Sequence, residues 1–231
     1  MDLMGATVKW LADPVNWQGP NGIPSRLMEH VALSGVSILA AALIALPLGM
    51  WIGHSGRFSW WIVSTANAWR ALPSFAVIGL LIPFTTLIDR DLGSTLYPTL
   101  IAMIVLAGPP ILVNAFQGIA DVDRDLVEAA RAMGMKERQI LIGVEVPIAL
   151  PALATGIRSA AIQVIATATL GSAFGFGGLG RFIVLGDANQ DFGELFGGVV
   201  LVVVLALTTL GAFLVLERRL VSAGLSRAGA G

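Results

Sequence analysis

Apolar residues in this chain gather into long runs, which is the pattern of helices that cross a lipid bilayer. A spanning helix needs about 20 consecutive apolar residues. Five stretches meet that requirement, at about 31–53, 59–88, 95–119, 149–173 and 195–216. Shorter polar segments separate them. The pattern therefore predicts an all-α integral membrane protein that forms a bundle of five spans.

The second stretch leaves the span count open, because Arg70 interrupts it. Splitting this stretch at Arg70 gives six spans. The basic segment around Arg131 and the pair Arg218–Arg219 would then fall on opposite faces of the membrane. Lys and Arg residues close to spans are retained on the cytoplasmic side. We therefore prefer five spans, with six as the alternative.

The distribution of positive charge predicts the orientation. With five spans and an outer N-terminus, Arg57, Arg124, Arg131, Lys136, Arg138, Arg218, Arg219 and Arg227 lie inside, whereas Lys9, Arg26, Arg90 and Arg181 lie outside. We accordingly expect three parts. Segment 1–29 is extracytoplasmic or interfacial, segment 30–217 is the transmembrane domain, and segment 218–231 is a cytoplasmic tail. The polar loop at residues 121–146 then lies in the cytoplasm.

Composition supports a membrane protein and disfavours several other classes. The chain is 56% hydrophobic and 13% charged, with a mean hydropathy of +0.82, whereas soluble domains carry about a quarter charged residues. It has no cysteine and a formal net charge of -1. Disulfides, thiolate zinc sites and iron–sulfur clusters are thereby excluded. No nucleic-acid partner, metal or cofactor is expected on this chain.

Charged and helix-breaking residues inside the apolar runs need a role. Arg70 and Arg158 either extend to the interface or line a passage, because an arginine in lipid is costly. The sequence Gly108-Pro109-Pro110 predicts a helix break in the third span. Five glycines inside the runs permit close helix contacts: Gly35, Gly49, Gly79, Gly156 and Gly171. They indicate either a bundle with a moving passage or ordinary packing of membrane helices.

The polar loop 121–146 predicts two short helices joined by a glycine turn. Asp125 with Glu128 three residues later resembles a capping pair, and Gly134 stands where a helix ends in a left-handed residue. Four apolar residues recur at helical spacing on one face: Leu126, Ala129, Ala130 and Met133. The simplest interpretation is a surface helix on a cytoplasmic loop.

The same loop resembles the EAA motif of permease subunits of type I binding-protein-dependent ABC importers, and residues 121–146 are called the coupling loop below. The resemblance implies the cell membrane of a bacterium or archaeon. The matching positions are Glu128-Ala129-Ala130, Gly134 and Pro147, with Val144 and Val146 where that family more often has Ile and Leu. The resemblance implies that these five positions form the helix that couples the spans to a cytoplasmic ATPase. This chain has no phosphate loop. ATP and Mg²⁺ are thus expected on a partner chain, and this subunit is not expected to be an enzyme.

A second glycine cluster follows the fourth stretch. Gly175, Gly177, Gly178 and Gly180 satisfy the G-x-G-x-x-G template, but a membrane span precedes them instead of a strand of a soluble βαβ unit, so dinucleotide binding is rejected. The cluster resembles the G-G-L-G segment of methionine and quaternary-ammonium importer permeases. It is expected to form part of an outer gate or a binding-protein contact, or else to be a flexible connector.

Residues 156–170 resemble permeases of the glycine betaine, carnitine and choline group. The resemblance implies import of quaternary ammonium solutes, including proline betaine, with an extracytoplasmic binding protein and a second permease, either a copy or a homologue. A methionine or other small-solute importer is the alternative. No dense aromatic box for a quaternary ammonium ion is visible; Trp69, Phe174 and Phe176 either pack or lie near the passage.

Other classes fit less well. A secondary transporter would show repeats and ion sites at mid-membrane, a channel needs no EAA loop, and an intramembrane enzyme needs a catalytic set. The two histidines, His30 and His54, stand at span ends without a catalytic motif. We therefore expect interfacial polar roles for them and assign no catalytic residue.

Overall fold

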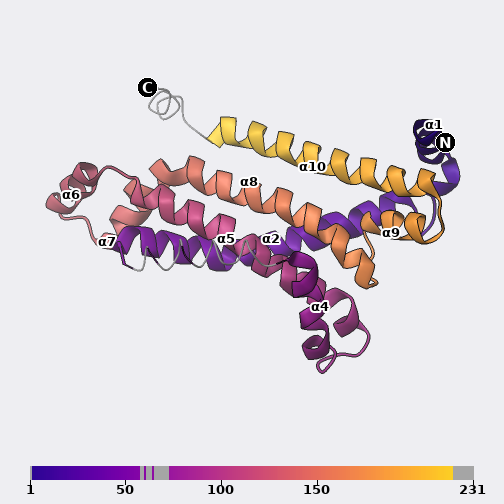
Figure 1. The fold of residues 1–231 in the computed structure, drawn as a ribbon. Helices are drawn as coiled ribbons and strands as arrows, with labels where there is room; N and C mark the ends of the chain where they lie inside the picture. Colours follow the sequence, from indigo (N-terminus) through magenta and orange to yellow (C-terminus); the bar gives the residue numbers. More distant parts are fainter. Residues whose placement is uncertain (1, 58–59, 61–63, 65–72, 221–231) are drawn as a thin grey trace. The chain divides into compact units, whose positions relative to one another are not determined.

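The computed structural model describes residues 2–57, 60, 64 and 73–220, and every regular element in that part of the chain is a helix (Figure 1). The first elements are α1 (Leu3–Ala12), the 3₁₀ turn η1 (Pro14–Trp17) and α2 (Ile23–Ser55). Next come α4 (Ser74–Thr85), η2 (Leu92–Ser94), α5 (Leu96–Ala120), α6 (Arg124–Ala132) and α7 (Glu137–Ile140). The last are the π-helical turn η3 (Leu141–Glu145), α8 (Val146–Gly171), η4 (Ser172–Phe174), α9 (Gly180–Ala188) and α10 (Phe192–Leu220).

Four helical stretches of the described chain are long and apolar enough to cross a membrane. They are Ile23–Ser55, Leu96–Ala120, Glu137–Phe174 and Phe192–Arg219. Helix α4 has 12 residues, about 18 Å at 1.5 Å per residue, which is shorter than a bilayer core of about 30 Å. Much of the predicted second span, including Arg70, lies outside the described residues. The choice between five and six spans thus stays a prediction.

Helix α5 runs without interruption through Pro109 and Pro110, so the break predicted at this point is wrong. The side-chain amide of Asn114 donates a 2.8 Å hydrogen bond to the Pro110 carbonyl. Membrane helices tolerate proline where nearby side chains and helices satisfy the freed backbone groups. Local sequence alone overestimated the cost of the two prolines.

The chain divides into two compact units. Unit 1 comprises Met1–Leu39, Leu72–Leu106 and Ala161–Thr209, and unit 2 comprises Ala40–Ala71, Ala107–Ala160 and Leu210–Gly231. Each of the four long helices α2, α5, α8 and α10 contributes one stretch to each unit. Helices α1, α4 and α9 belong to unit 1, and α6 and α7 belong to unit 2.

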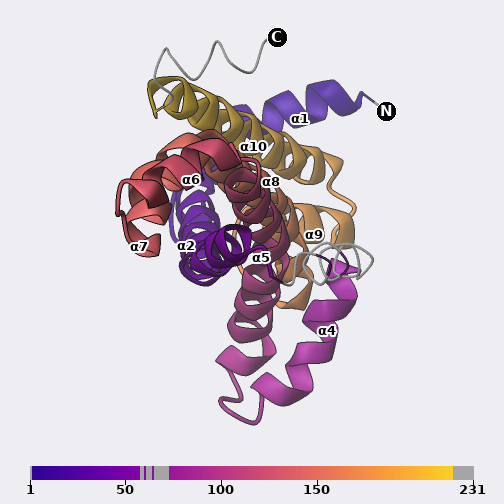
Figure 2. The ribbon, with the colours of Figure 1, turned by 90° about the vertical axis from the view of Figure 1, so that its left-hand side faces the viewer.

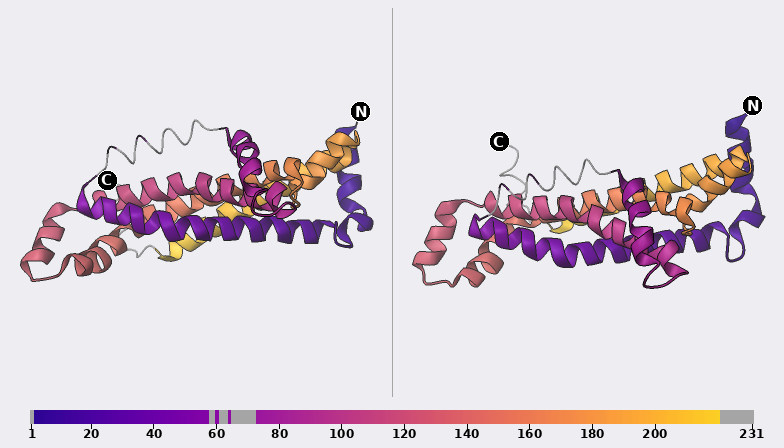
Figure 3. Two further views of the ribbon diagram at one scale, coloured as in Figure 1. Left: turned by 90° about the horizontal axis from the view of Figure 1, so that it is seen from below. Right: turned by 60° about the horizontal axis from the view of Figure 1, so that its bottom comes forward.

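The core of unit 1 joins the N-terminal segment to the region around α9 (Figure 3). Ile23, Leu179 and Phe182 are buried together, and Trp10 of α1 packs against them. The rings of Trp10 and Phe182 meet edge to face, with centroids 5.1 Å apart. Such aromatic pairs add to the burial of apolar surface, so α1 is held by packing within this unit.

The core of unit 2 combines alanines with larger aliphatic residues. Ala115 and Ile119 of α5 pack against Ala149 and Leu153 of α8, and Figure 2 shows α2, α5 and α8 side by side here. Small side chains let helix backbones approach closely, which is how helices associate in membranes. This close packing supports the base of the coupling loop.

Helix α10 has the opposite character. Its most hydrophobic stretch has no buried residue in the part of the chain that the structure describes. An apolar helix exposed on this scale needs lipid or another protein around it. The helix therefore gives this subunit a large surface for the membrane or for a second subunit.

Candidate functional site

The first helix of the coupling loop has a clear start and end. Asp123 is its N-cap, and its carboxylate accepts a 2.9 Å hydrogen bond from the Asp125 backbone N–H. The cap predicted at Asp125 is therefore wrong by two residues, because Asp123 reaches the free N–H groups first. Gly134 follows the helix with φ of 86°, the left-handed conformation that was predicted and that glycine adopts without strain.

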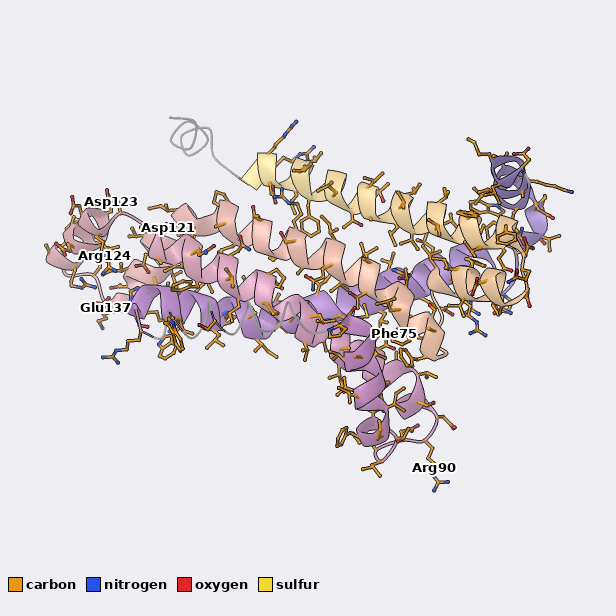
Figure 4. All side chains as sticks on the ribbon, in the orientation of Figure 1. Phe75, Arg90, Asp121, Asp123, Arg124 and Glu137 are labelled. Carbon is orange, nitrogen blue, oxygen red and sulfur yellow. The ribbon has the colours of Figure 1, made fainter. Side chains whose placement is uncertain are left out.

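Helix α6 turns most of its apolar residues outward. Ala130 is buried, whereas Leu126 is 50% exposed, Met133 is 76% exposed and Ala129 is also exposed. A helix that merely packs onto its own protein would bury this face. Around it, the charged side chains of Asp121, Asp123, Arg124 and Glu137 extend from the loop (Figure 4). The exposed apolar face, defined as Leu126, Ala129 and Met133, is therefore available to a partner.

Behind α6, a chain of polar contacts connects the loop to the end of α2. Arg131 donates two hydrogen bonds to Glu137, of 2.8 and 2.9 Å. His54 Nε2 lies 3.1 Å from Glu137 Oε2, one of the two oxygens that Arg131 contacts, and His54 Nδ1 lies 2.6 Å from Glu145 Oε2. The hydrogen bond to Glu137 raises the pKa of the Arg131 guanidinium. Arg131 is consequently a permanent positive charge at the loop.

A small cavity of about 70 Å³ lies between α6 and the end of α2. His54, Glu128, Arg131 and Glu145 line it together with the backbone of Gly53. Its size and polar lining suit one or two water molecules. Glu128, the acidic residue of the EAA segment, therefore borders the same polar region as His54.

Glu29 and His30, two consecutive residues of α2, hold the glycine cluster in unit 1. Glu29 Oε2 accepts hydrogen bonds of 2.8 Å from the Gly178 N–H and from Arg26 Nη1. Gly178 has φ of 73°, and Gly180 is the first residue of α9. The cluster is thus a hydrogen-bonded turn between α8 and α9.

His30 is completely buried instead of interfacial. Its Nδ1 accepts a 3.3 Å hydrogen bond from the Leu179 N–H, and its Nε2 lies 3.1 Å from the Ile165 carbonyl. A ring that accepts at Nδ1 and faces a carbonyl at Nε2 carries its proton on Nε2. His30 therefore ties α2, α8 and the glycine turn together within unit 1.

Unit 1 also contains an open polar cavity of about 590 Å³. Its lining includes Trp10, Arg26, Arg181, Phe182 and Glu194, so charges of both signs and two aromatic rings border it. Arg181 is the residue that directly follows the glycine turn. The cavity and the turn thus form one polar region of this unit.

The comparisons with known proteins identify the family. The model of the binding-protein-dependent transport system inner membrane component family matches residues 45–227. This chain belongs to that family. It is accordingly a permease subunit of an ABC transporter, a translocation component, and an integral inner-membrane protein with several spans.

Two curated relatives match most of the permease. It is 34% identical over 192 residues to the carnitine transport permease protein OpuCB of Listeria monocytogenes, covering 83% of this chain and 85% of the relative. It is 33% identical over 199 residues to the choline transport system permease protein OpuBB of Bacillus subtilis, covering 86% and 88%. Both matches therefore cover more than four fifths of each chain.

Solved structures share the fold at lower identity. The inward-facing methionine ABC transporter MetNI has a chain with a TM-score of 0.77 and 24% identity, covering 90% of this permease and 99% of that chain. An amino acid ABC transporter gives a TM-score of 0.72 at 19% identity, covering 95% and 99%. The all-α permease bundle expected from the sequence is thereby confirmed as a fold class.

The arginine in the fourth apolar stretch of the permease has a partner that sequence reasoning missed. Arg158 on α8 forms an ion pair of 2.5 Å with Glu217 at the end of α10, and both side chains are mostly buried. The other Glu217 oxygen is buried without a hydrogen-bond partner in the described part of the chain. Arg158 is therefore paired with a carboxylate of another long helix. Arg70 lies outside the described residues.

Three acidic residues in this permease carry contacts that were not anticipated: Glu29, Glu145 and Glu217. Each stands within or beside an apolar run, and that is the signal that could have found them, because an unpaired carboxylate in lipid is costly. Phe174, considered near the passage, packs on Phe75 with ring centroids 4.7 Å apart. Trp69 lies outside the described residues.

Proposed function

We propose that this permease imports quaternary ammonium compatible solutes, the class that includes glycine betaine, carnitine, choline and proline betaine. Two observations support the substrate class. The curated relatives named above are carnitine and choline transport permeases, and residues 156–170 resemble the same group. The similarity to a methionine transporter is under 25% identity and concerns the fold alone.

The exposed apolar face of α6 carries the proposal that a separate ATPase drives transport. Leu126 and Met133 form an apolar contact surface, and Gly134 makes the sharp turn that lets α6 project. Glu128 offers a carboxylate beside this face. We assign coupling to Glu128, Ala129, Ala130 and Gly134, with Pro147 at the start of α8. ATP and Mg²⁺ are bound by the partner.

The remaining partners follow from the same assignment. The coupling loop faces the cytoplasm, the N-terminus lies outside and the C-terminus inside. A second permease, a copy or a homologue, completes the passage. An extracytoplasmic binding protein docks near the polar cavity of unit 1, where Gly175, Gly177, Gly178 and Gly180 form part of the outer gate. Arg70 and Arg158 border the passage.

The docking of the ATPase is tested with Met133→Asp. Burying a Met side chain contributes about 1.5–3 kcal/mol, so its loss weakens ATPase binding by about ten- to a hundredfold. Arg138→Ala, an exposed change on neighbouring α7, is the control and is expected to bind the ATPase normally. The measurement is the amount of ATPase that copurifies with the permease over a range of ATPase concentrations. Equal retention by both variants would refute the docking surface.

The substrate class is tested in vesicles that contain the permease, its ATPase and its binding protein. Radiolabelled glycine betaine, carnitine or choline is expected to accumulate only when ATP is supplied on the side of the ATPase. Methionine is the comparison solute. Accumulation of methionine without accumulation of any quaternary amine would assign the permease to the alternative class.

A further inference from the structure

His54 is the point where the end of α2 meets the coupling loop. It lies one residue before the last residue of α2, and its two ring nitrogens contact carboxylates on different elements of the loop. Glu137 is the first residue of α7, and Glu145 is the last residue of the π-helical turn η3. Through Glu137 the contacts continue to Arg131 on α6. One side chain thus connects a span to three segments of the loop.

The two contacts of the His54 ring differ in kind. Nδ1 lies within hydrogen-bond distance of Glu145 Oε2, at 2.6 Å, whereas Nε2 lies 3.1 Å from Glu137 Oε2, which is an ion-pair distance. The charged groups around the ring are Glu145 on η3, Glu137 on α7, and Glu128, Arg124 and Arg131 on α6. The ring therefore lies between two acidic side chains that belong to different elements of the loop.

The backbone of the loop places Glu145 in this position. Glu145 is 4% exposed, although it lies in a polar loop at the entrance to α8. A π-helical turn widens the helix by one residue and rotates the side chains that follow, and such turns occur frequently at functional sites. Burying a carboxylate is costly unless it is paired. The turn and the His54 contact therefore depend on each other.

We propose that His54 is a positioning residue that transmits the displacement of α6 to α2 during transport. This inference rests on the proposed docking of the ATPase on α6. When the ATPase moves the exposed face, the rigid two-bond contact of Arg131 with Glu137 moves α7 with α6. The His54 contacts then carry that motion to the first long helix. An exposed pair such as Arg131–Glu137 contributes little to stability. Its role in this proposal is to link the position of α7 to that of α6.

The experiment compares His54→Gln and Glu137→Gln with wild type in reconstituted complexes. Gln keeps a polar side chain at position 54 but replaces the rigid ring that contacts both carboxylates. Glu137 is 56% exposed, so its replacement disturbs no core. Arg57→Gln, an exposed change three residues beyond His54, is the matched control. The quantities measured are ATPase retention, ATP hydrolysis and solute uptake, expressed as ATP consumed per solute.

Both test variants are expected to retain the ATPase and to consume about fivefold or more ATP per solute, the lower range of coupling between linked sites. A merely structural defect lowers ATP hydrolysis and solute uptake together and leaves the ATP consumed per solute unchanged. If both test variants consumed the same ATP per solute as Arg57→Gln, the proposal would be overturned. Loss of ATPase retention by the test variants would also overturn the proposal. A failure of the docking proposal is distinguished from this, because Met133→Asp would then retain the ATPase normally.

Discussion

Gly49 on α2 lies against α5 so closely that a single added methyl group is expected to destabilise the permease. An ideal Cβ at this position would lie 2.6 Å from the Leu112 carbonyl oxygen and 2.8 Å from the Ala115 Cβ. The carbonyl belongs to a helix backbone and cannot rotate away. Gly49→Ala therefore forces α2 and α5 apart within unit 2.

Gly35 on the same helix gives the opposite expectation. No atom of the described chain lies within 4 Å of an ideal Cβ at Gly35. Replacing a helical glycine with alanine there removes backbone freedom from the unfolded chain and stabilises by about 0.5–1 kcal/mol. Overpacking at Gly49 costs about 1–3 kcal/mol, offset in part by the same gain. The two identical substitutions are thus expected to differ in sign.

The assay is thermal or denaturant unfolding of the purified permease in detergent, with wild type, Gly35→Ala and Gly49→Ala measured side by side. Gly53→Ala is a second test, because its Cβ would lie 2.7 Å from the Phe116 carbonyl oxygen. Gly49 and Gly53 share one contact surface, so their effects are not expected to add. Equal stability of Gly49→Ala and Gly35→Ala would show that α2 and α5 are not packed as described.

Two further predictions concern the ion pair in unit 2 and the topology. Glu217→Ala is expected to destabilise the permease by about 3 kcal/mol, because it leaves Arg158 without its partner. The double change Arg158→Met with Glu217→Leu is expected to recover most of that stability. Unfolding measurements that find the single and double variants equally stable would contradict the pairing. Cysteines introduced at positions 5 and 225 are expected to react with an impermeant reagent from opposite sides of the membrane. The chain has no native cysteine, so labelling of both positions from one side would contradict the five-span prediction.

The local features of the coupling loop were predictable from the sequence because they depend on neighbouring residues. Polar helix-forming residues between two apolar runs predicted a helix, and Gly134 predicted its left-handed end. The spacing of the EAA segment predicted the family, which the comparisons confirm. The cap was misplaced by two residues, at Asp125 instead of Asp123, because both aspartates are equally good caps on sequence grounds.

The sequence by itself determined that this protein is an all-α membrane protein, where most apolar runs lie, and which loop resembles a coupling segment. Run length, turn residues and motif spacing are properties of short stretches of chain. Only the tertiary structure distinguished Gly49, which has no room for a methyl group, from Gly35, which has. It also brought His54 to Glu145 and Arg158 to Glu217. These pairs are separated by many residues, and no local pattern states which helices approach each other or which buried charges meet.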